Sequence, residues 1–265
     1  MSEHFSKALP EILNLPISKK LVFCLDFDGT LAPIRRKPSH VKASAALLKF
    51  LKQAASLHSC KVAIVSGRQL KDLKRKLRVP GIILAGSHGL EWNIRADRDL
   101  SRFKKLKKLQ NQWRPVLRRI KGVSIENKPF SFVVHYRRAS RKQQEQVSGF
   151  FLKQSDDLAR KGFEWTSAHK AYEIFESERG RKEHVSRDLM QRFRGARMIA
   201  AGDDVTDFEM LRHGNRFGWA ATIGFKRRGI KYFAKGPGDF VRCLNRILAP
   251  RLRAVRATKK KSGDI

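Results

Sequence analysis

Short apolar runs alternate with segments of helical spacing over the first third of the chain. Residues 21–25 are apolar at five consecutive positions, which is typical of a strand buried on both faces of a parallel sheet. Residues 62–65 and 82–85 form two similar runs, whereas 42–57 and 69–77 have apolar residues at helical spacing. This order predicts a parallel α/β sheet, whose ligands bind at the carboxyl ends of the strands.

The pattern changes at about residue 97. Two helical segments are each followed by two strand-like segments: a helix at 102–121 with strands at 123–125 and 130–136, and a helix at 141–161 with strands at 163–166 and 171–175. Helix, two strands, helix, two strands is the order expected of an α+β unit with an antiparallel sheet.

The parallel pattern then resumes, with predicted helices at 181–194, 208–213 and 239–248 and predicted strands at 196–201 and 217–221. We therefore predict an α/β core made of residues 1–96 and 178–250, interrupted by an α+β domain at 97–177. Residues 251–265 are basic and polar, and we predict that they form a disordered tail.

Acidic residues follow the first of these strands. Asp26 and Asp28 are two positions apart, so both carboxylates leave an extended segment on the same side. They would repel each other unless a proton or a cation lay between them, and Mg²⁺ is the simplest cation that takes oxygen ligands. Asp28-Gly29 could instead form a hairpin turn, but no alternating second strand follows it.

Further candidates lie at other strand ends. Asp203, Asp204 and Asp207 follow the predicted strand at 196–201, where they could form a second set of metal ligands. Helix capping explains one such acid well and three poorly. Ser66 could be a functional hydroxyl or a helix cap, and Lys182 could reach the site or be one solvated charge among 58 Lys and Arg residues.

The charge is strongly unbalanced, with 58 Lys and Arg against 24 Asp and Glu and a formal net charge of +34. Such a surface attracts phosphates, nucleic acids and acidic membranes alike. The basic residues are dispersed over every segment and no nucleic-acid-binding motif is apparent, so we expect no specific nucleic-acid partner. A nucleic-acid-binding protein on the same scaffold remains the alternative from a different functional class.

The three cysteines, Cys24, Cys60 and Cys243, are widely spaced and lie in or near apolar segments. This favours buried free thiols in a reducing compartment over a disulfide framework or a zinc site. No apolar run resembles a signal peptide or approaches the roughly 20 residues of a membrane span. We therefore expect a cytoplasmic protein without a membrane span.

Taken in order, these motifs resemble the four motifs of the haloacid dehalogenase (HAD) superfamily of phosphohydrolases, with residues 26–30 as the first, Ser66 as the second, Lys182 as the third and residues 202–207 as the fourth. The stretches Asp-Phe-Asp-Gly-Thr-Leu-Ala-Pro, Val-Ser-Gly-Arg, Gly-Ser-His-Gly-Leu-Glu and Gly-Asp-Asp-Val-Thr-Asp are more narrowly similar to the trehalose-6-phosphate phosphatase family. Two features depart from it: Phe208-Glu209 stands where an acidic pair is common, and the segment before Lys182 lacks the usual Asp-Lys-Gly pattern.

The resemblance implies a Rossmann-like parallel core with an inserted α+β cap, and a Mg²⁺-dependent phosphoric monoester hydrolase of trehalose biosynthesis. Asp26 would attack phosphorus to give an aspartyl-phosphate, and Asp28 would act as the general acid and base. The implied phosphate-binding residues are Gly29, Thr30, Ser66, Gly67 and Lys182. The implied metal set is Asp26, Asp28, Asp203, Asp204 and Asp207, with Asp28 contributing its backbone carbonyl.

The substrate implied is a small sugar phosphate, trehalose 6-phosphate first and another disaccharide or glycosyl phosphate second. Its sugar would contact Arg68, Ser87, His88 and Glu91 on the core and Lys128, Arg137, Lys170 and Glu173 on the cap. His88 could equally be a structural turn residue, and Glu173 could form an ion pair with Lys170 or with a neighbouring strand. The hypothesis of a catalytically silent regulatory domain is weakened, because the aspartates of the first and fourth motifs are all present.

Overall fold

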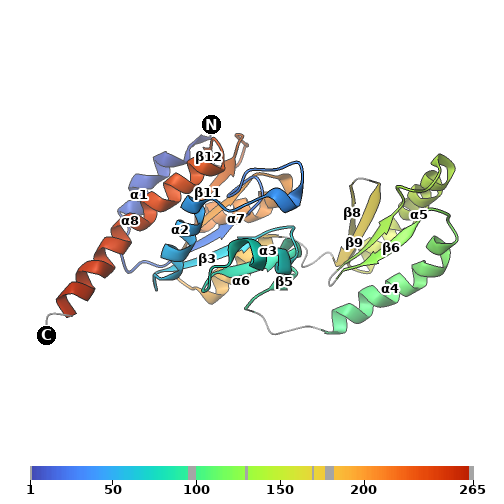
Figure 1. Ribbon diagram of the computed structural model, residues 1–265, viewed down its shortest axis with the longest axis horizontal. Helices are drawn as coiled ribbons and strands as arrows, with labels where there is room; N and C mark the ends of the chain where they lie inside the picture. Colours follow the sequence, from blue (N-terminus) through green and yellow to red (C-terminus); the bar gives the residue numbers. More distant parts are fainter. Residues whose placement is uncertain (1, 95–99, 129–130, 169, 177–181, 263–265) are drawn as a thin grey trace. The chain divides into compact units, whose positions relative to one another are not determined.

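The computed structural model describes residues 2–94, 100–128, 131–168, 170–176 and 182–262 (Figure 1). The chain divides into two compact units, a core formed by Met1–Ile94 with Arg181–Ile265 and a cap formed by Arg95–Gly180. The division lies within a few residues of the predicted domain boundaries. Those boundaries lie outside the described residues. The same is true of the segment 178–181 before Lys182 and of the first residues of the predicted elements at 130–136 and 181–194.

The core is built on an eight-stranded sheet. In sheet order its strands are β1 (Glu3–His4), β12 (Tyr232–Ala234), β11 (Gly218–Ile223), β10 (Arg197–Gly202), β2 (Leu21–Leu25), β3 (Cys60–Val65), β4 (Ile83–Gly86) and β5 (Glu91–Trp92). Neighbouring strands run parallel, except that β4 and β5 are antiparallel. The predicted α/β class with a parallel sheet is therefore confirmed.

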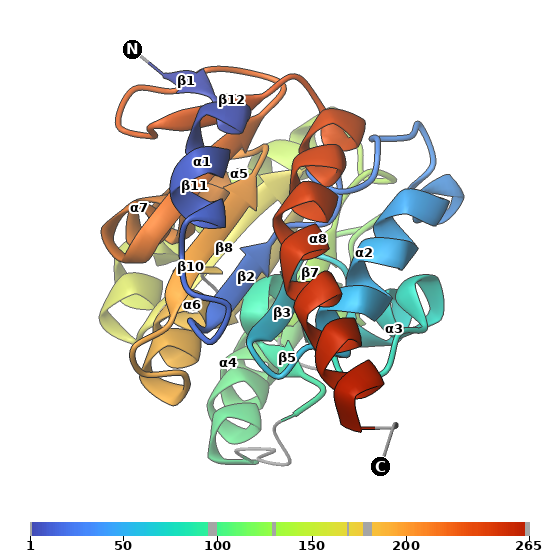
Figure 2. The same ribbon diagram turned by 90° about the vertical axis from the view of Figure 1, so that its left-hand side faces the viewer.

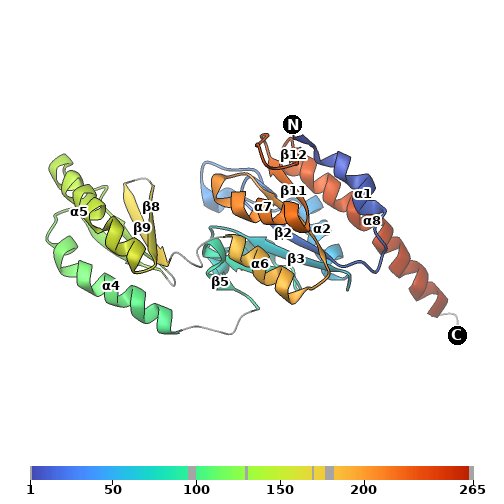
Figure 3. The same ribbon diagram turned by 180° about the vertical axis from the view of Figure 1, so that it is seen from behind.

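Strand β2 is apolar at every position because both of its faces are covered. Leu21, Phe23 and Leu25 belong to one hydrophobic cluster, and Val22 and Cys24 belong to the cluster on the opposite face. Figure 2 shows α1 (Leu9–Leu13), α2 (Ala45–Ala55) and α8 (Pro237–Ser262) over the first face. Figure 3 shows α6 (Lys182–Arg192) and α7 (Phe208–Phe217) from behind, and residues of both pack in the second cluster.

The C-terminal segment differs from the prediction, because α8 continues to Ser262 and the expected disordered tail from Arg251 is helical over its described part. Arg251 is only 2% exposed, and its guanidinium donates to the carbonyl oxygens of Ile17 and Lys19 at 2.7 and 2.8 Å. The composition of the segment indicated that Arg251 would be exposed to solvent. In the fold, its guanidinium instead binds carbonyl groups of a segment more than 200 residues away in the sequence.

The cap has its own sheet and its own core. Its four strands are antiparallel in the order β6 (Ser124–Asn127), β7 (Ser131–His135), β9 (Ala171–Glu176) and β8 (Phe163–Ala168). Helices α4 (Leu100–Arg118) and α5 (Arg141–Arg160) contribute Trp113 and Phe151 to a cluster with Phe132, Tyr172 and Ile174 of the sheet. Because side chains alternate along a strand, Glu173 lies on the sheet face opposite this cluster.

Two further expectations concern the whole chain. Cys24, Cys60 and Cys243 are all buried free thiols, as predicted. Among the helices of the described residues, none is long and apolar enough to cross a bilayer.

Candidate active site

Asp26 extends the central strand by one residue. Its backbone N–H donates to the carbonyl of Ala201 in β10 at 2.9 Å, and its side chain is buried. The chain then turns at Gly29, which has a φ of +80°. A Cβ atom there would lie 1.9 Å from Oδ2 of Asp203, so both the turn and the close approach of Asp203 require glycine.

The loop after β10 brings three carboxylates together. Asp207 is fully buried, and its Oδ2 accepts the backbone N–H groups of Asp203 and Asp204 at 3.1 and 3.0 Å. The Thr30 hydroxyl donates to Oδ1 of Asp203 at 2.9 Å and so ties this loop to the one after β2. Asp26, Asp203 and Asp207 each offer an oxygen, and these oxygens lie within 4.8 Å of one another.

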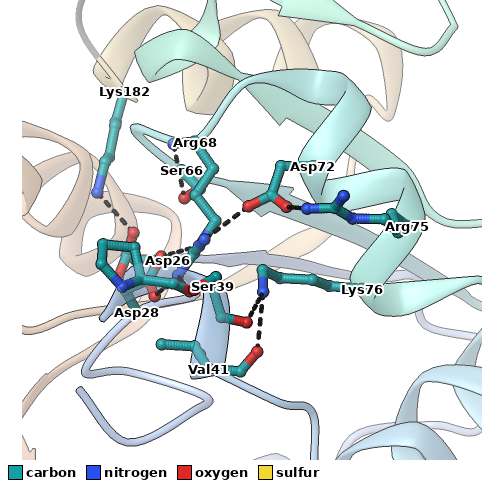
Figure 4. A network of polar contacts seen from close by, with 11 residues as sticks. Asp26, Asp28, Ser39, Val41, Ser66, Arg68, Asp72, Arg75, Lys76 and Lys182 are labelled. Carbon is teal, nitrogen blue, oxygen red and sulfur yellow. Dashed lines mark hydrogen bonds and ion pairs between the residues drawn. The ribbon is translucent and has the colours of Figure 1, made fainter. Parts of the chain in front are cut away.

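Lys182 enters this cluster from the first residue of α6. Its Nζ donates to Oδ1 of Asp26 at 2.7 Å and to Oδ1 of Asp207 at 2.6 Å, and the residue is only 4% exposed. Figure 4 shows the Lys182 side chain reaching Asp26. Lys182 is therefore a buried member of the site, and its interpretation as a solvated surface charge is wrong.

Burial and neighbouring charges shift the pKa values of the residues in this cluster. Burial raises the pKa of Asp26 to about 6, although the Lys182 ammonium opposes the shift. The pKa of Asp207 is also about 6, raised by burial and by the charge of Asp26. Burial alone would lower the pKa of Lys182, but the two carboxylates raise it above its ordinary value. With all three carboxylates ionised, the single ammonium leaves two negative charges, which a divalent cation would neutralise.

Asp28 and Asp204, both in the predicted metal set, have their side chains elsewhere. The Asp28 carboxylate accepts hydrogen bonds from Nε and Nη2 of Arg68 at 2.6 and 2.7 Å (Figure 4). Asp204 is exposed, and its carboxylate accepts the backbone N–H of Val205 at 2.6 Å, as a helix cap does. Of the five predicted residues, the cluster contains the side chains of Asp26, Asp203 and Asp207.

The predicted phosphate-binding residues other than Lys182 lie in the turns at the ends of β2 and β3. Ser66 is buried, and its hydroxyl accepts the backbone N–H of Arg68 at 3.2 Å. A Cβ atom on Gly67 would lie 2.8 Å from the His88 ring, which packs closely over this turn. The N–H of Gly29 donates to the carbonyl of Ala32 at 2.7 Å in this structure, so it holds its own turn.

The predicted sugar-binding residues of the core lie beside η3 (Ser87–Gly89). The Ser87 hydroxyl donates to Oε1 of Glu91 at 2.5 Å, while Oε2 of Glu91 accepts the N–H of Leu70 at 3.3 Å. The backbone N–H of His88 donates to the carbonyl of Ser66 at 2.9 Å, which joins this segment to the second motif. Ser87, His88 and Glu91 are thus placed around the end of β4, and His88 contacts Ser66.

The predicted cap residues lie on or beside the cap sheet. Nζ of Lys128 lies 3.0 Å from both carboxylate oxygens of Glu173, and the Ser131 hydroxyl donates to Oε1 of Glu173 at 2.5 Å. The ion pair considered for Glu173 is therefore made with Lys128, and its other partner is the neighbouring strand β7. Lys170 lies in the β8–β9 turn with a φ of +61°, and Arg137 follows β7 on the surface.

One charged residue near the site was not identified from the sequence. Asp72 in α3 (Leu70–Leu77) accepts Nη1 of Arg68 at 2.6 Å, and its other oxygen accepts Nη2 of Arg75 at 2.7 Å. The available signal was that Asp72 is the only acid in this otherwise basic helix and lies four residues after Arg68.

Comparison with known proteins identifies the family. Residues 24–230 match the family described as trehalose-phosphatase. The trehalose-phosphate phosphatase of Mycobacterium ulcerans (strain Agy99) is 30% identical over 205 residues, which are 73% of this chain and 51% of that protein. The chain thus spans about half the length of the curated relatives it matches.

Solved structures show the same fold. The Aspergillus fumigatus trehalose-6-phosphate phosphatase (crystal form 2) has a TM-score of 0.70 and 21% identity, and the match covers 94% of this chain and all of that one. A phosphatase of the HAD superfamily from Bacteroides thetaiotaomicron has a TM-score of 0.54 and 15% identity over 88% of this chain and 97% of that one. Together with the family match, these findings confirm that the chain belongs to the trehalose-phosphatase family, with the fold of the HAD superfamily.

Proposed function

We propose that the chain is a Mg²⁺-dependent phosphatase that hydrolyses trehalose 6-phosphate to trehalose and inorganic phosphate. The observation that carries the proposal is the buried cluster in which Lys182 bridges Asp26 and Asp207 beside Asp203. The family match supports the substrate, because relatives of the chain are named trehalose-phosphate phosphatases.

The acidic cluster fits a hard divalent cation. All of its donors are carboxylate oxygens, which Mg²⁺ prefers, and their excess of two negative charges matches its charge. Asp26, Asp203 and Asp207 are the side chains that would hold the ion. When bound, Mg²⁺ would neutralise part of the negative charge of the substrate phosphate and help to orient it.

The reaction would proceed in two displacements. In the first, a carboxylate oxygen of Asp26 bonds to phosphorus and the ester P–O bond breaks; the sugar oxygen keeps the electron pair and takes a proton from Asp28. In the second, water bonds to phosphorus and gives a proton to the Asp28 carboxylate, while the bond between phosphorus and Asp26 breaks. The products are the free sugar and inorganic phosphate, and both aspartates return to their starting states.

Lys182 has two tasks in this scheme. Its ammonium keeps one oxygen of Asp26 in place through the 2.7 Å contact, so the carboxylate presents its other oxygen to the substrate. Its positive charge also offsets the negative charge of the phosphoryl oxygens. The Ser66 hydroxyl, buried at the end of β3, is a further donor for those oxygens.

A phosphate-release assay with trehalose 6-phosphate tests the proposal. Excess chelator should abolish the release of phosphate and added Mg²⁺ should restore it, whereas Ca²⁺ should bind but support turnover poorly because its coordination is larger and looser. Glucose 6-phosphate serves as the comparison substrate. Full activity in chelator would overturn the metal assignment, and equal rates on the two sugars would overturn the disaccharide assignment.

Glu173 provides a test of substrate recognition by the cap. It lies on the sheet face opposite the cap helices, where Lys128 and Ser131 hold its carboxylate. A carboxylate accepts hydrogen bonds from sugar hydroxyls, so Glu173→Ala should lower kcat/KM for trehalose 6-phosphate by about 10-fold or more. Hydrolysis of a small aryl phosphate, which lacks the sugar, should change little.

Glu145→Ala is the matched control for this experiment. Glu145 lies on α5, which covers the opposite face of the cap sheet, and pairs with Arg141 at 3.5 Å, so its removal also deletes one carboxylate and one ion pair. An equal loss in the two variants would assign the effect to the charge of the cap in general. An equal loss on both substrates in Glu173→Ala would show that Glu173 is structural.

A further inference from the structure

Arg68 joins the loop after β2 to helix α3. Its guanidinium donates through Nε and Nη2 to the two oxygens of Asp28, and through Nη2 also to the carbonyl of Pro38 at 2.8 Å. Its remaining nitrogen, Nη1, donates to Oδ2 of Asp72 at 2.6 Å. Figure 4 shows Asp28, Arg68, Asp72 and Arg75 in one continuous series of contacts.

We propose that Asp72 is a positioning residue that acts on Asp28 through Arg68 and so supports protonation of the leaving sugar oxygen. The proposal rests on the role of Asp28 in the proposed function. A guanidinium is planar and presents its donors in a fixed fork, so holding one edge sets the direction of the other. Asp72 holds the edge that faces away from Asp28.

The surroundings of Asp72 indicate a specific role. The other charged residues of α3 are Lys71, Lys74, Arg75 and Lys76, so solvation of the helix does not require an acid. Burial would raise the pKa of Asp72, but hydrogen bonds from Arg68 and Arg75 lower it below its ordinary value. Arg68 itself is largely buried, with its side chain 10% exposed, and the pair is therefore less screened than a surface ion pair.

Asp28 depends on this support because its own environment is open. It follows a strand end, and its side chain is one-third exposed. Within the described residues, Arg68 supplies the hydrogen bonds that both of its oxygens receive. To carry a proton to the leaving oxygen, Asp28 must release one of these two contacts. Asp72 and the Pro38 carbonyl then keep Arg68 in place, so that the remaining contact still orients the carboxyl.

The leaving group of the substrate distinguishes this role from a structural one. A sugar alkoxide is a poor leaving group and needs the proton from Asp28, whereas p-nitrophenolate departs without protonation. Misplacing Asp28 should therefore slow the first displacement, which sets kcat/KM, on trehalose 6-phosphate and spare it on p-nitrophenyl phosphate. The second displacement, in which Asp28 takes a proton from water, is common to both substrates and affects kcat alone. General acids contribute about 10² to 10⁴ in rate, so partial misplacement should lower kcat/KM on the sugar phosphate by about 10-fold.

The experiment measures kcat and KM on both substrates for Asp72→Ala, Asp72→Asn and Arg75→Ala. Arg75→Ala is the control, because it removes the other partner of Asp72 and leaves the contact with Arg68. We expect the Asp72 variants to lose kcat/KM on trehalose 6-phosphate selectively, with kcat/KM on p-nitrophenyl phosphate unchanged and with Arg75→Ala close to wild type. Asp72→Asn, which keeps the size of the side chain, decides the question if Asp72→Ala does not fold.

A second set of variants tests whether Asp72 acts through Asp28. In an Asp28→Asn background, Asp72→Ala should cause no further loss, because coupled residues are not additive. Equal loss of kcat/KM on both substrates, no loss in either Asp72 variant, or full additivity would overturn the inference while leaving the proposed function standing. A wild-type chain that releases phosphate from neither substrate would overturn the proposed function and this inference together.

Discussion

Asp26→Asn is expected to remove turnover of trehalose 6-phosphate and to leave the fold intact. An amide nitrogen or oxygen does not replace a carboxylate as the attacking group, and removal of a covalent nucleophile from other enzymes lowers kcat by about 10⁶. The fold should survive because asparagine keeps the size of the side chain. Its carbonyl oxygen can still accept the hydrogen bond that Lys182 now donates to Oδ1 at 2.7 Å.

The measurement combines steady-state phosphate release with thermal unfolding. Asp156→Asn, at an exposed position of α5, is the matched control for the same change in charge and should retain the wild-type rate. Deamidation would regenerate Asp26, so the mass of the purified variant should be checked. A correctly folded Asp26→Asn protein that keeps a tenth of the wild-type activity would rule out the covalent mechanism.

The location of the site could be predicted because it depends on local pattern. The apolar run at 21–25, the acids that follow it and the later strand ending at Asp203 all indicate one edge of a parallel sheet, and the structure places them there. The insertion of a second domain was visible for the same reason, since the change from parallel to antiparallel patterning is a property of neighbouring residues.

The partners of individual charges could not be predicted, because they depend on contacts between distant segments. Lys182 and Asp26 are 156 positions apart, and nothing local to Lys182 distinguishes it from the other basic residues. The same holds for Arg251, whose carbonyl partners lie more than 200 residues away in the sequence. Strand β1, two residues long, pairs with β12 near the other end of the chain and carries too little pattern to be recognised.

The roles of Asp204 and Asp207 also depend on geometry. Both follow the same strand, and their spacing in the sequence does not show which of the two carboxylates joins the acidic cluster. The short helix η4 (Val205–Asp207) turns Asp207 back onto the N–H groups of Asp203 and Asp204, which buries it beside Asp26. The same turn leaves Asp204 at the helix start, where its carboxylate caps Val205 in solvent.

Lys182→Met is expected to lower the free energy of unfolding of the metal-free protein by about 3 kcal/mol or more at pH 8, the scale of breaking a buried ion pair by removing one partner. Methionine approximates the length of lysine and keeps the space filled, so the loss isolates the charge. The variant leaves Asp26 and Asp207 buried close together without the ammonium that now contacts both. Denaturant unfolding in excess chelator gives the value.

Lys52→Met is the matched control. Lys52 is exposed on α2, and such surface substitutions usually change the free energy of unfolding by less than about 0.5 kcal/mol. A loss in Lys182→Met no larger than in this control would contradict the burial and pairing of Lys182.

The effect of pH and of Mg²⁺ on the free energy of unfolding distinguishes the contribution of the Lys182 charge from that of its packing. The pKa values of Asp26 and Asp207 lie at about 6 in the folded protein, above the ordinary 3.8, so their contribution to stability falls as pH rises from about 3.8 to 6. Lys182 lowers both pKa values, and without it they should rise further. The difference in the free energy of unfolding between variant and wild type should therefore be small at pH 5 and grow towards pH 8.

Excess Mg²⁺ binds the folded state and should stabilise the variant more than the wild type, because the variant site carries one more uncompensated negative charge. A loss that is the same at pH 5 and pH 8 and unchanged by Mg²⁺ would show that Lys182 contributes through packing, and the carboxylate cluster would then lose its electrostatic case for a divalent cation.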